Sequence, residues 1–518
     1  MKFAMDLTRE LFCRPISRLL LRMDKEPDAL YVGVTPDEEN PGRLSLSKIT
    51  PCLGKDELAY TVSVEAGKVR LEAGEGWAEF AIALPNRLLI RAHGLTLLFG
   101  NGKGASVFMG GGSAVKDAYN PGGAMLSASG VKLRFIPKKG DIEVIAGWQL
   151  ETLADPDPRV YLHPDENDDL DVIMYESDYD QPCPDDGMTV DTAATETVGE
   201  FEKFLQTIKL PSENEAYLKA AYYIWAALQP DRDLSEKRIT APEYTAGRGG
   251  AAIAELSDSV LLSLLFKDKA TALAQLGSFL KYMQPDGLVP RYVSNKHFAL
   301  QSELPLFGFA LKELLDDETE VCPELYAALA KAFDWWHNER YCPERKIFYY
   351  LHRYEPGCCK KLPFADTPPE FAPDLNACII LWLDALAAMA KKLGKDEESA
   401  KYAALAAETR TALVERLWNG NSFFHMNIMD QPVCEGHPRT LLPIIMADTL
   451  PEDITAAVAG AIPAEPGEDV IYLAYGLRKA DSAKLKAIAD KVYAELSKLP
   501  IMTVRQAITL LLVCGTAN

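Results

Sequence analysis

The sequence lacks the long apolar runs and basic clusters that would assign it to a membrane or to nucleic acid. Nowhere do about 18 apolar residues follow one another, so no transmembrane helix is expected. Asp and Glu number 75 against 54 Lys and Arg, which gives a formal net charge of −21. Because an acidic surface repels phosphate groups, the composition argues against binding to nucleic acid or to an anionic membrane surface.

Metal-binding and redox signatures are also missing. The 10 Cys residues include no CxxC pair, and the 7 His residues include no HExxH motif and no i, i+4 pair. We therefore expect neither a catalytic zinc ion nor another cofactor. The first 25 residues carry no continuous apolar core of signal-peptide length. Free thiols in a cytoplasmic protein are the simplest interpretation.

The sequence has an ordinary globular composition, with 48% hydrophobic residues, and its pattern changes near residue 205. Before that point, short runs rich in β-branched and aromatic residues alternate with Gly, Pro and Asn turns, as in Tyr60–Val64. Many short strands without intervening helical patterns are typical of an antiparallel sandwich. We therefore predict a β-sandwich domain over residues 1–205.

After residue 205 the apolar period becomes helical. Twelve helices are predicted, over about 213–228, 253–266, 269–283, 302–315, 322–338, 374–393, 396–418, 439–448, 452–461, 468–478, 482–498 and 502–515.

The links between these helices alternate in length. Four long links cover about 229–252, 284–301, 339–373 and 419–438, and the links between them are short. Because short links join antiparallel neighbours, strict alternation places every long loop at one end of the domain. The pattern predicts a closed (α/α)6 toroid of six helical hairpins over residues 206–518, with the functional site at the loop-rich end. An open superhelix of helix pairs is the structural alternative.

Several short motifs occur in a fixed order on the loops and helix ends. They are Gln284–Pro290, Ser302–Pro305, Trp335–Arg340, Glu355–Cys359, Asp374–Ala377 and Arg416–Phe424. This ordered set resembles the six-hairpin glycosidases, namely trehalase-like enzymes and the α-glucosidases of glycoside hydrolase family 63. The resemblance covers residues 212–424 and implies an (α/α)6 barrel that acts on a carbohydrate.

The sequence departs from that family at both catalytic positions. The family's general acid is the Asp of an E-x-G-x-D motif, and here Cys359 occupies that position, next to Cys358. The family's general base lies between the last two helices, where this chain has only Leu499–Pro500. Because hydrolysis by inversion requires two carboxyl groups that flank the bond, the usual pair is not available.

Other carboxylates on the same loops are candidates for a relocated pair. The predicted catalytic residues are Glu355, Asp366 and Glu435. We interpret Asp374 as a helix N-cap, and Asp258 and Glu303 as structural. The side chains predicted to bind the sugar by stacking or hydrogen bonding are Trp336, Arg340, Tyr292, Gln301 and Tyr354.

Three functions are compatible with these features. The first is a glycoside hydrolase that acts on a small oligosaccharide or glucoside through two carboxylates. The second is a sugar-binding protein with a decayed site, which the Cys359 substitution and the missing base favour. The third is a carbohydrate lyase or epimerase, for which His352, Tyr354 or His437 is a candidate base. The abundance of carboxylates at the loop-rich end favours the hydrolase.

Overall fold

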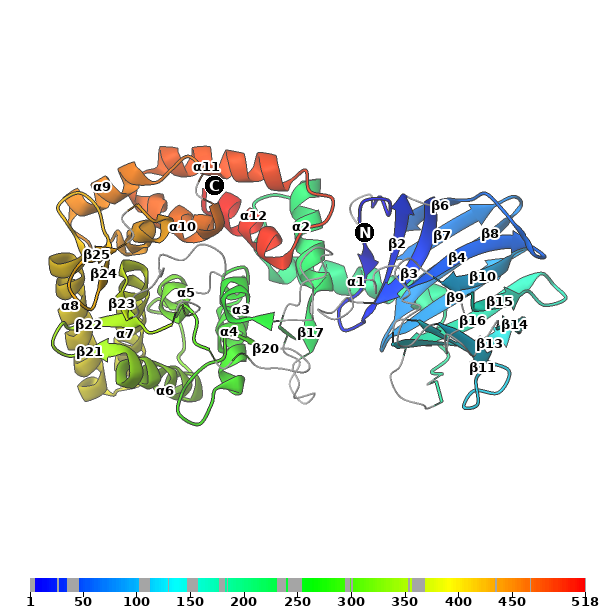
Figure 1. The fold of residues 1–518 in the computed structure, drawn as a ribbon, viewed down its shortest axis with the longest axis horizontal. Coiled ribbons are helices and arrows are strands. Elements are labelled where there is room, and N and C mark those ends of the chain that lie inside the picture. The colour runs from blue at the N-terminus through cyan, green and yellow to red at the C-terminus, as the bar shows by residue number, and fades with distance from the viewer. Residues whose placement is uncertain are drawn as a thin grey trace.

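The computed structural model describes residues 5–25, 28–34, 46–101, 112–128, 130–146, 157–176, 182–183, 185–230, 239–240, 254–293, 299, 301–352, 355, 369–433, 436–465 and 467–517. These residues form a β-sheet unit followed by a ring of helices, and the two lie side by side in Figure 1.

Two eight-stranded antiparallel sheets make up the N-terminal part. The first has the order β1-β2-β3-β4-β10-β15-β14, with β5 paired to β4, and the second has the order β11-β12-β13-β16-β9-β8-β7-β6. The first sheet contains β1 Phe12–Cys13, β2 Leu19–Lys25, β3 Asp28–Val34, β4 Ser47–Leu53, β5 Asp56–Glu57, β10 Thr96–Asn101, β14 Asp141–Ile145 and β15 Arg159–His163. The second contains β6 Thr61–Glu65, β7 Lys68–Ala73, β8 Gly76–Ala83, β9 Arg87–His93, β11 Ser113–Lys116, β12 Ala124–Ala128, β13 Val131–Lys139 and β16 Asp169–Glu176. Both sheets contribute to one apolar core, so the predicted antiparallel sandwich is confirmed.

A helix that the sequence analysis did not predict follows the last strand. Helix α1, Val190–Thr207, begins at Thr189, whose side chain accepts a hydrogen bond from the Thr192 N–H. Its apolar face, which includes Ala193 and Ala194, packs against β8 and β9. The helix crosses the predicted domain boundary at residue 205.

All twelve predicted helices occur among the described residues. They are α2 Glu215–Ala226, α3 Leu256–Ser263, α4 Lys269–Leu276 with its continuation η2 Gly277–Tyr282, α5 Phe307–Leu314, α6 Pro323–Arg340, α7 Pro373–Lys392, α8 Asp396–Leu417, η3 Pro438–Met446, α9 Glu452–Ala461, α10 Val470–Ala480, α11 Ser482–Leu496 and α12 Val504–Ala517. The eighth, η3, is a 3-10 helix, because Pro443 in its interior cannot donate an α-helical hydrogen bond.

The six inner helices close into a ring. Helices α3, α5, α7, η3, α10 and α12 contact one another in that order, and α12 contacts α3 again. The predicted toroid is therefore confirmed, and the open superhelix is excluded. Helix α7 is apolar and long enough to cross a membrane, but 83% of its most apolar window is buried inside the ring, as expected for a core helix.

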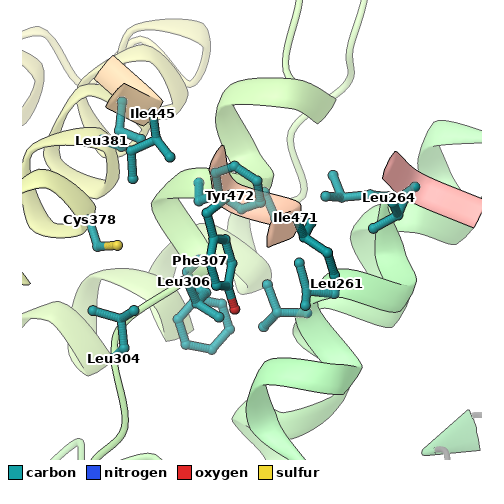
Figure 2. Packing of buried hydrophobic residues seen from close by; sticks show 14 of the residues in the cluster. Leu261, Leu264, Leu304, Leu306, Phe307, Cys378, Leu381, Ile445, Ile471 and Tyr472 are labelled. Carbon is teal, nitrogen blue, oxygen red and sulfur yellow. The ribbon is translucent and has the colours of Figure 1, made fainter. Parts of the chain in front are cut away.

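The centre of the ring is a packed core. Figure 2 shows Leu261, Phe307, Leu381 and Ile471 converging from four different inner helices. Across the centre, the Phe309 ring of α5 lies 5.4 Å from the Tyr472 ring of α10. Because side chains fill the middle, a ligand has access only at an end of the toroid.

Short strands connect the long links to one another. Strand β19, Ala254–Glu255, pairs with β20, Tyr292–Val293, and so joins the first long link to the second. A five-stranded sheet joins the other two links through β21 Tyr341–Cys342, β22 Ile347–Tyr350, β23 Glu370–Phe371, β24 His425–Asn427 and β25 Pro432–Val433. A further pair, β17 Gln229–Pro230 and β18 Ile239–Thr240, lies within the first link. Each long link leads into the N-terminus of an inner helix, so the described parts of these links gather at one end.

The ring closes tightly enough to require glycine at a helix contact. A Cβ atom added at Gly308 of α5 would overlap the backbone nitrogen of Trp382 in α7. We expect Gly308→Ala to lower the free energy of unfolding by about 1–3 kcal/mol, because two backbones would have to separate. Thermal and denaturant unfolding measure this loss.

Gly199 provides the matched control. It lies inside α1, and a Cβ atom added there meets nothing within 4 Å. Gly199→Ala should raise the stability by up to about 1 kcal/mol, because alanine favours helix. Equal melting temperatures for the two variants would show that the α5–α7 contact is not constrained as described.

Candidate active site

The N-terminal ends of the inner helices bring a set of charged residues together at one end of the toroid. Each inner helix contributes one of them from its first turn or the residues just before it: Asp258, Glu303, Asp374, Arg439, Asp469 and Arg505. We call this set the mouth ring. All six side chains are at least partly buried, and the carboxylates outnumber the arginines by four to two.

One half of the mouth ring is organised by Arg505. Its guanidinium donates to the Asp258 carboxylate and to the Ser257 hydroxyl, and a third nitrogen lies 3.5 Å from the Tyr472 hydroxyl. The Asp258 side chain is 4% exposed and that of Arg505 is 28% exposed. This ion pair joins the last inner helix to the first.

The other half is organised by Arg439. Its nitrogens lie 3.5 Å from Asp374 and 3.6 Å from Asp469. The Tyr350 hydroxyl donates to Asp374 Oδ2 over 3.2 Å. Asp374 therefore binds groups outside its own helix and is not the N-cap that the sequence predicted, since Ala372 holds that position.

Glu303 differs from the other acids of the mouth ring because the hydrogen bond that it accepts comes from a backbone group. Its Oε2 accepts a hydrogen bond from the Ser257 N–H at 3.3 Å, and its side chain is almost fully buried. Burial, together with the nearby Glu255 carboxylate, raises the pKa of Glu303 to about 7, although Arg291 and Arg505 oppose the change. With this pKa, about half of the molecules hold a proton on Glu303 at pH 7, and protonation of this kind is what a general acid requires.

A buried glutamate–histidine pair lies beside the mouth ring. The Glu370 carboxylate on β23 bonds to Nδ1 of His425 on β24, and the two residues are 0% and 2% exposed. The His425 ring lies 5.9 Å from the ring of His437, which precedes η3. Among the described residues, Glu370 Oε2 and His425 Nε2 have no hydrogen-bond partner.

Glu355 and Arg340, which the sequence placed in the site, bind to each other. Arg340 Nη2 and Nε lie 2.7 and 3.0 Å from Glu355 Oε1, while the Leu351 and His352 N–H groups donate to Oε2. The Glu355 carboxylate is 3% exposed, and both of its oxygens are already engaged. This geometry favours a structural ion pair over a free proton donor.

The remaining predicted residues have different surroundings. Trp336 is buried and its ring packs edge-on against Trp335, which Arg340 covers at 4.9 Å. Tyr292 is half-buried on β20, opposite Glu255, close to the start of α3. Gln301 is exposed, and its carbonyl accepts the Arg291 N–H. Asp366, Glu435 and Tyr354, together with Cys358 and Cys359, lie outside the described residues.

Sequence reasoning did not assign a role in the site to Arg505, Tyr350 or Tyr472. Arg505 and Asp258 are separated by 247 positions, so no local pattern links them. The sequence offered one signal for Arg505, namely its position just after the predicted start of an inner helix. A charged residue in that place faces the end where the long links gather.

Two pockets formed by described residues open elsewhere on the toroid. One, of about 420 Å³, is lined by the C-terminal parts of α3, α5, α10 and α12. The other, of about 380 Å³, lies between the start of α2 and the helices α11 and α12. Neither contains a mouth-ring residue. In the described part of the chain, no group of three or more His, Cys, Asp or Glu is placed to hold a metal ion.

The raised pKa of Glu303 makes a prediction about stability. Folding holds a proton on Glu303 up to about pH 7, whereas the unfolded chain releases it near pH 4.5, so the free energy of unfolding falls between these values. Relative to Glu303→Gln, the wild-type protein should lose up to about 3 kcal/mol from pH 4.5 to pH 8. Denaturant titrations of both proteins measure the difference, and parallel pH profiles would contradict the assigned environment.

Comparison with known proteins agrees with a glycosidase fold. Residues 261–467 match the family model of the mannosylglycerate hydrolase MGH1-like glycoside hydrolase domain. None of the curated proteins matches the chain.

Three solved structures have the same overall fold. A bacterial glucoamylase complexed with acarbose has a TM-score of 0.55 at 12% identity, covering 97% of this chain and 92% of its own. A GH92 α-mannosidase from Bacteroides thetaiotaomicron, in complex with mannoimidazole, has a TM-score of 0.54 at 12% identity. The match covers 98% of this chain and 81% of the mannosidase chain. An inverting GH92 mannosidase from the same organism has a TM-score of 0.52 at 10% identity. The match covers 98% of this chain and 82% of that mannosidase.

These similarities confirm the resemblance to the six-hairpin glycosidases at the level of fold. The β-sandwich and the toroid occur together in the matched structures, since almost the whole chain is covered. The helical domain is an (α/α)6 toroid, and residues 261–467 of it match the model of a glycoside hydrolase domain.

Proposed function

We propose that the protein hydrolyses a glycosidic bond in a small oligosaccharide or glycoside, with Glu303 as the proton donor. The observation that carries this proposal is the burial of the Glu303 carboxyl group in the mouth ring, where a backbone N–H is its hydrogen-bond donor; this burial raises its pKa to about 7. A glycosidic oxygen needs a proton as its bond breaks, and a carboxyl group that is neutral near pH 7 supplies it.

Asp469 is the proposed partner that activates water. Its side chain is 13% exposed, more than that of Asp258 or Asp374, and its Oδ2 lies 3.6 Å from Arg439 Nε. Helices α5 and α10 occupy opposite positions in the ring and touch through Phe309 and Tyr472.

Because α5 and α10 lie on opposite sides of the ring, the carboxyl groups of Glu303 and Asp469 belong to opposite sides of the mouth. An inverting glycosidase requires two carboxyl groups on opposite sides of the bond, roughly 6.5–9.5 Å apart, with water between them. Water on the Asp469 side and protonation on the Glu303 side would act on opposite faces of the sugar.

Product release from a panel of small glycosides tests the proposal. The panel includes trehalose, maltose, α-mannosides and mannosylglycerate, the last because of the name of the matching family model. Glu303→Gln should lower kcat/KM by about 10²–10⁴-fold and remove the decline in rate above pH 7. Substrates with a leaving group that needs no proton should recover most of this loss.

The other candidates are compared in the same assay. Asp469→Asn should lower kcat without recovery by a better leaving group, and added azide should restore turnover as a glycosyl azide. Asp366→Asn and Glu435→Gln test the pair predicted from the sequence, and Glu355→Gln tests its ion pair with Arg340. Asp384→Asn, on the outer side of α7 beside Arg410, is the control and should retain activity.

Three outcomes would contradict the assignment. Full activity in Glu303→Gln would exclude it as the acid, and loss confined to Asp366→Asn and Glu435→Gln would favour the pair predicted from sequence. Sugar binding without turnover on any substrate would favour a binding protein.

A further inference from the structure

At the end of the toroid opposite the mouth ring, the C-terminal parts of α3, α5, α10 and α12 surround a pocket of about 420 Å³. This volume falls within the range of sites that bind small molecules. None of the residues that line the pocket belongs to the mouth ring, so a ligand bound here would not depend on the proposed function.

The apolar part of the pocket wall is made by leucines from several elements. They are Leu210, Leu264, Leu265, Leu314, Leu511 and Leu512. All except Leu210 are buried, so packing inside the toroid fixes their positions. A ligand that fills this space needs an aliphatic or aromatic part. We call the space the leucine pocket.

The polar part of the leucine pocket carries two cations and one carboxylate, which are Lys209, Arg478 and Glu313. Arg478 Nη2 lies 2.9 Å from both oxygens of Glu313. A guanidinium group has five N–H donors in a planar fork, and the Arg478 side chain is 42% exposed. A second carboxylate can therefore reach the guanidinium without displacing Glu313.

Lys209 approaches the same pocket from the segment that joins α1 to α2. Its amino group donates to the Leu264 carbonyl at 3.2 Å. Partial burial of the amino group lowers the pKa of Lys209, the Glu313 carboxylate opposes the change, and Lys269 adds to it. The charged form of Lys209 is therefore incompletely compensated, and a bound anion would stabilise it.

The two cations also lie near C-terminal ends of helices, whose partial negative charge they offset. That role requires neither a pocket nor leucines, whereas a ligand with an anionic head and an apolar body uses all three features. The Arg478 guanidinium carbon lies 5.5 Å from the centre of the Tyr475 ring, which also lines the pocket. This contact restrains the guanidinium at the pocket wall.

We propose that the leucine pocket binds a small amphipathic anion, with its carboxylate at Lys209 and Arg478 and its apolar body against the leucines. Arginine recognises a carboxylate through parallel hydrogen bonds, and the leucines contribute by removing the apolar body from water. The chain carries a formal net charge of −21, so an anion meets a favourable local charge where cations outnumber carboxylates, as they do here.

The first test compares ligands on the unaltered full chain. Calorimetric titration uses hexanoate, with acetate as the head alone, hexanol as the body alone and hexylammonium as the body with the opposite charge. Hexanoate should bind at least 10-fold more tightly than each of the other three, because only hexanoate uses both parts of the pocket. Added salt should weaken its binding by screening the cations.

Three results of this titration would overturn the proposal. Equal binding of hexanoate and hexanol would show that the cations do not recognise the head group. Equal binding of hexanoate and acetate would show that the leucines do not contact the body. Absence of binding for both hexanoate and benzoate, an aromatic carboxylate, would show that the pocket does not take this class of ligand.

The second test locates the bound ligand. Lys209→Met and Arg478→Met should each weaken hexanoate binding by about 5-fold or more, because each removes one charged partner of the carboxylate. Lys486→Met removes the same charge from the other pocket, of about 380 Å³, and should leave the affinity unchanged. Loss of binding in Lys486→Met, with none in Lys209→Met, would place the ligand in that other pocket and contradict the proposal.

A third variant fills the leucine pocket and removes no side chain that binds the ligand. Gly515 lines the pocket near the end of α12, and a Cβ atom added there meets only Pro211 Cγ, at 3.8 Å. Gly515→Leu should therefore abolish hexanoate binding, while the melting temperature stays equal or rises because leucine favours helix.

Gly460→Leu is the matched control for this variant. Gly460 lies in α9, away from the pocket, and a Cβ atom added there meets nothing within 4 Å. It should bind hexanoate as the unaltered chain does. Undiminished binding in Gly515→Leu would contradict the proposal, and if Arg478→Met fails to fold, Lys209→Met and Gly515→Leu decide it.

Discussion

The ion pair between Arg505 and Asp258 lies where the ring of inner helices closes. It joins α12, the last inner helix, to α3, the first, and it forms at the end where all six inner helices begin. Described apolar side chains pack the centre of the ring, so the charged residues of these helix ends lie above an apolar core. Buried charges must be paired or neutralised, and this requirement explains most of the contacts in the mouth ring.

Helix dipoles add to this constraint. The N-terminus of each helix carries a partial positive charge, which stabilises the carboxylates of Asp258 and Asp374 and disfavours the guanidinium groups of Arg439 and Arg505. The carboxylates that surround the two arginines offset this unfavourable interaction with the helix dipoles. Glu303 accepts its hydrogen bond from a backbone group, and a proton neutralises it in about half of the molecules at pH 7. Burial at the crowded mouth therefore gives Glu303, among the four acids of the mouth ring, a raised pKa that suits a general acid.

The sequence predicted the helices better than the site. Apolar periodicity and link lengths were sufficient for twelve helices and their closure, because both reflect local chain geometry. Helix α1 was missed, although its apolar face repeats at helical spacing, and η3 became a 3-10 helix because of Pro443. The five-stranded sheet was not predicted, since its strands have two to four residues and come from segments between 341 and 433.

The candidate site depended on distant pairings that no local pattern reveals. Glu355 matched a family motif, but its carboxylate is held by Arg340. Glu303 was interpreted as structural, and only the burial created by closure changes its chemistry. The surroundings of Asp258 also depend on ring closure, because its ion-pair partner, Arg505, lies on the last helix of the chain.

A crystal structure of Glu303→Gln with a bound neutral disaccharide tests the central claim most directly. The account predicts a sugar at the mouth ring, with the glycosidic oxygen within about 2.6–3.2 Å of the side chain at position 303. Asp469 should lie on the opposite face of the sugar, with room for a water molecule between them. A disaccharide bound in either pocket away from the mouth ring, or at the mouth with its glycosidic oxygen far from residue 303, would contradict it.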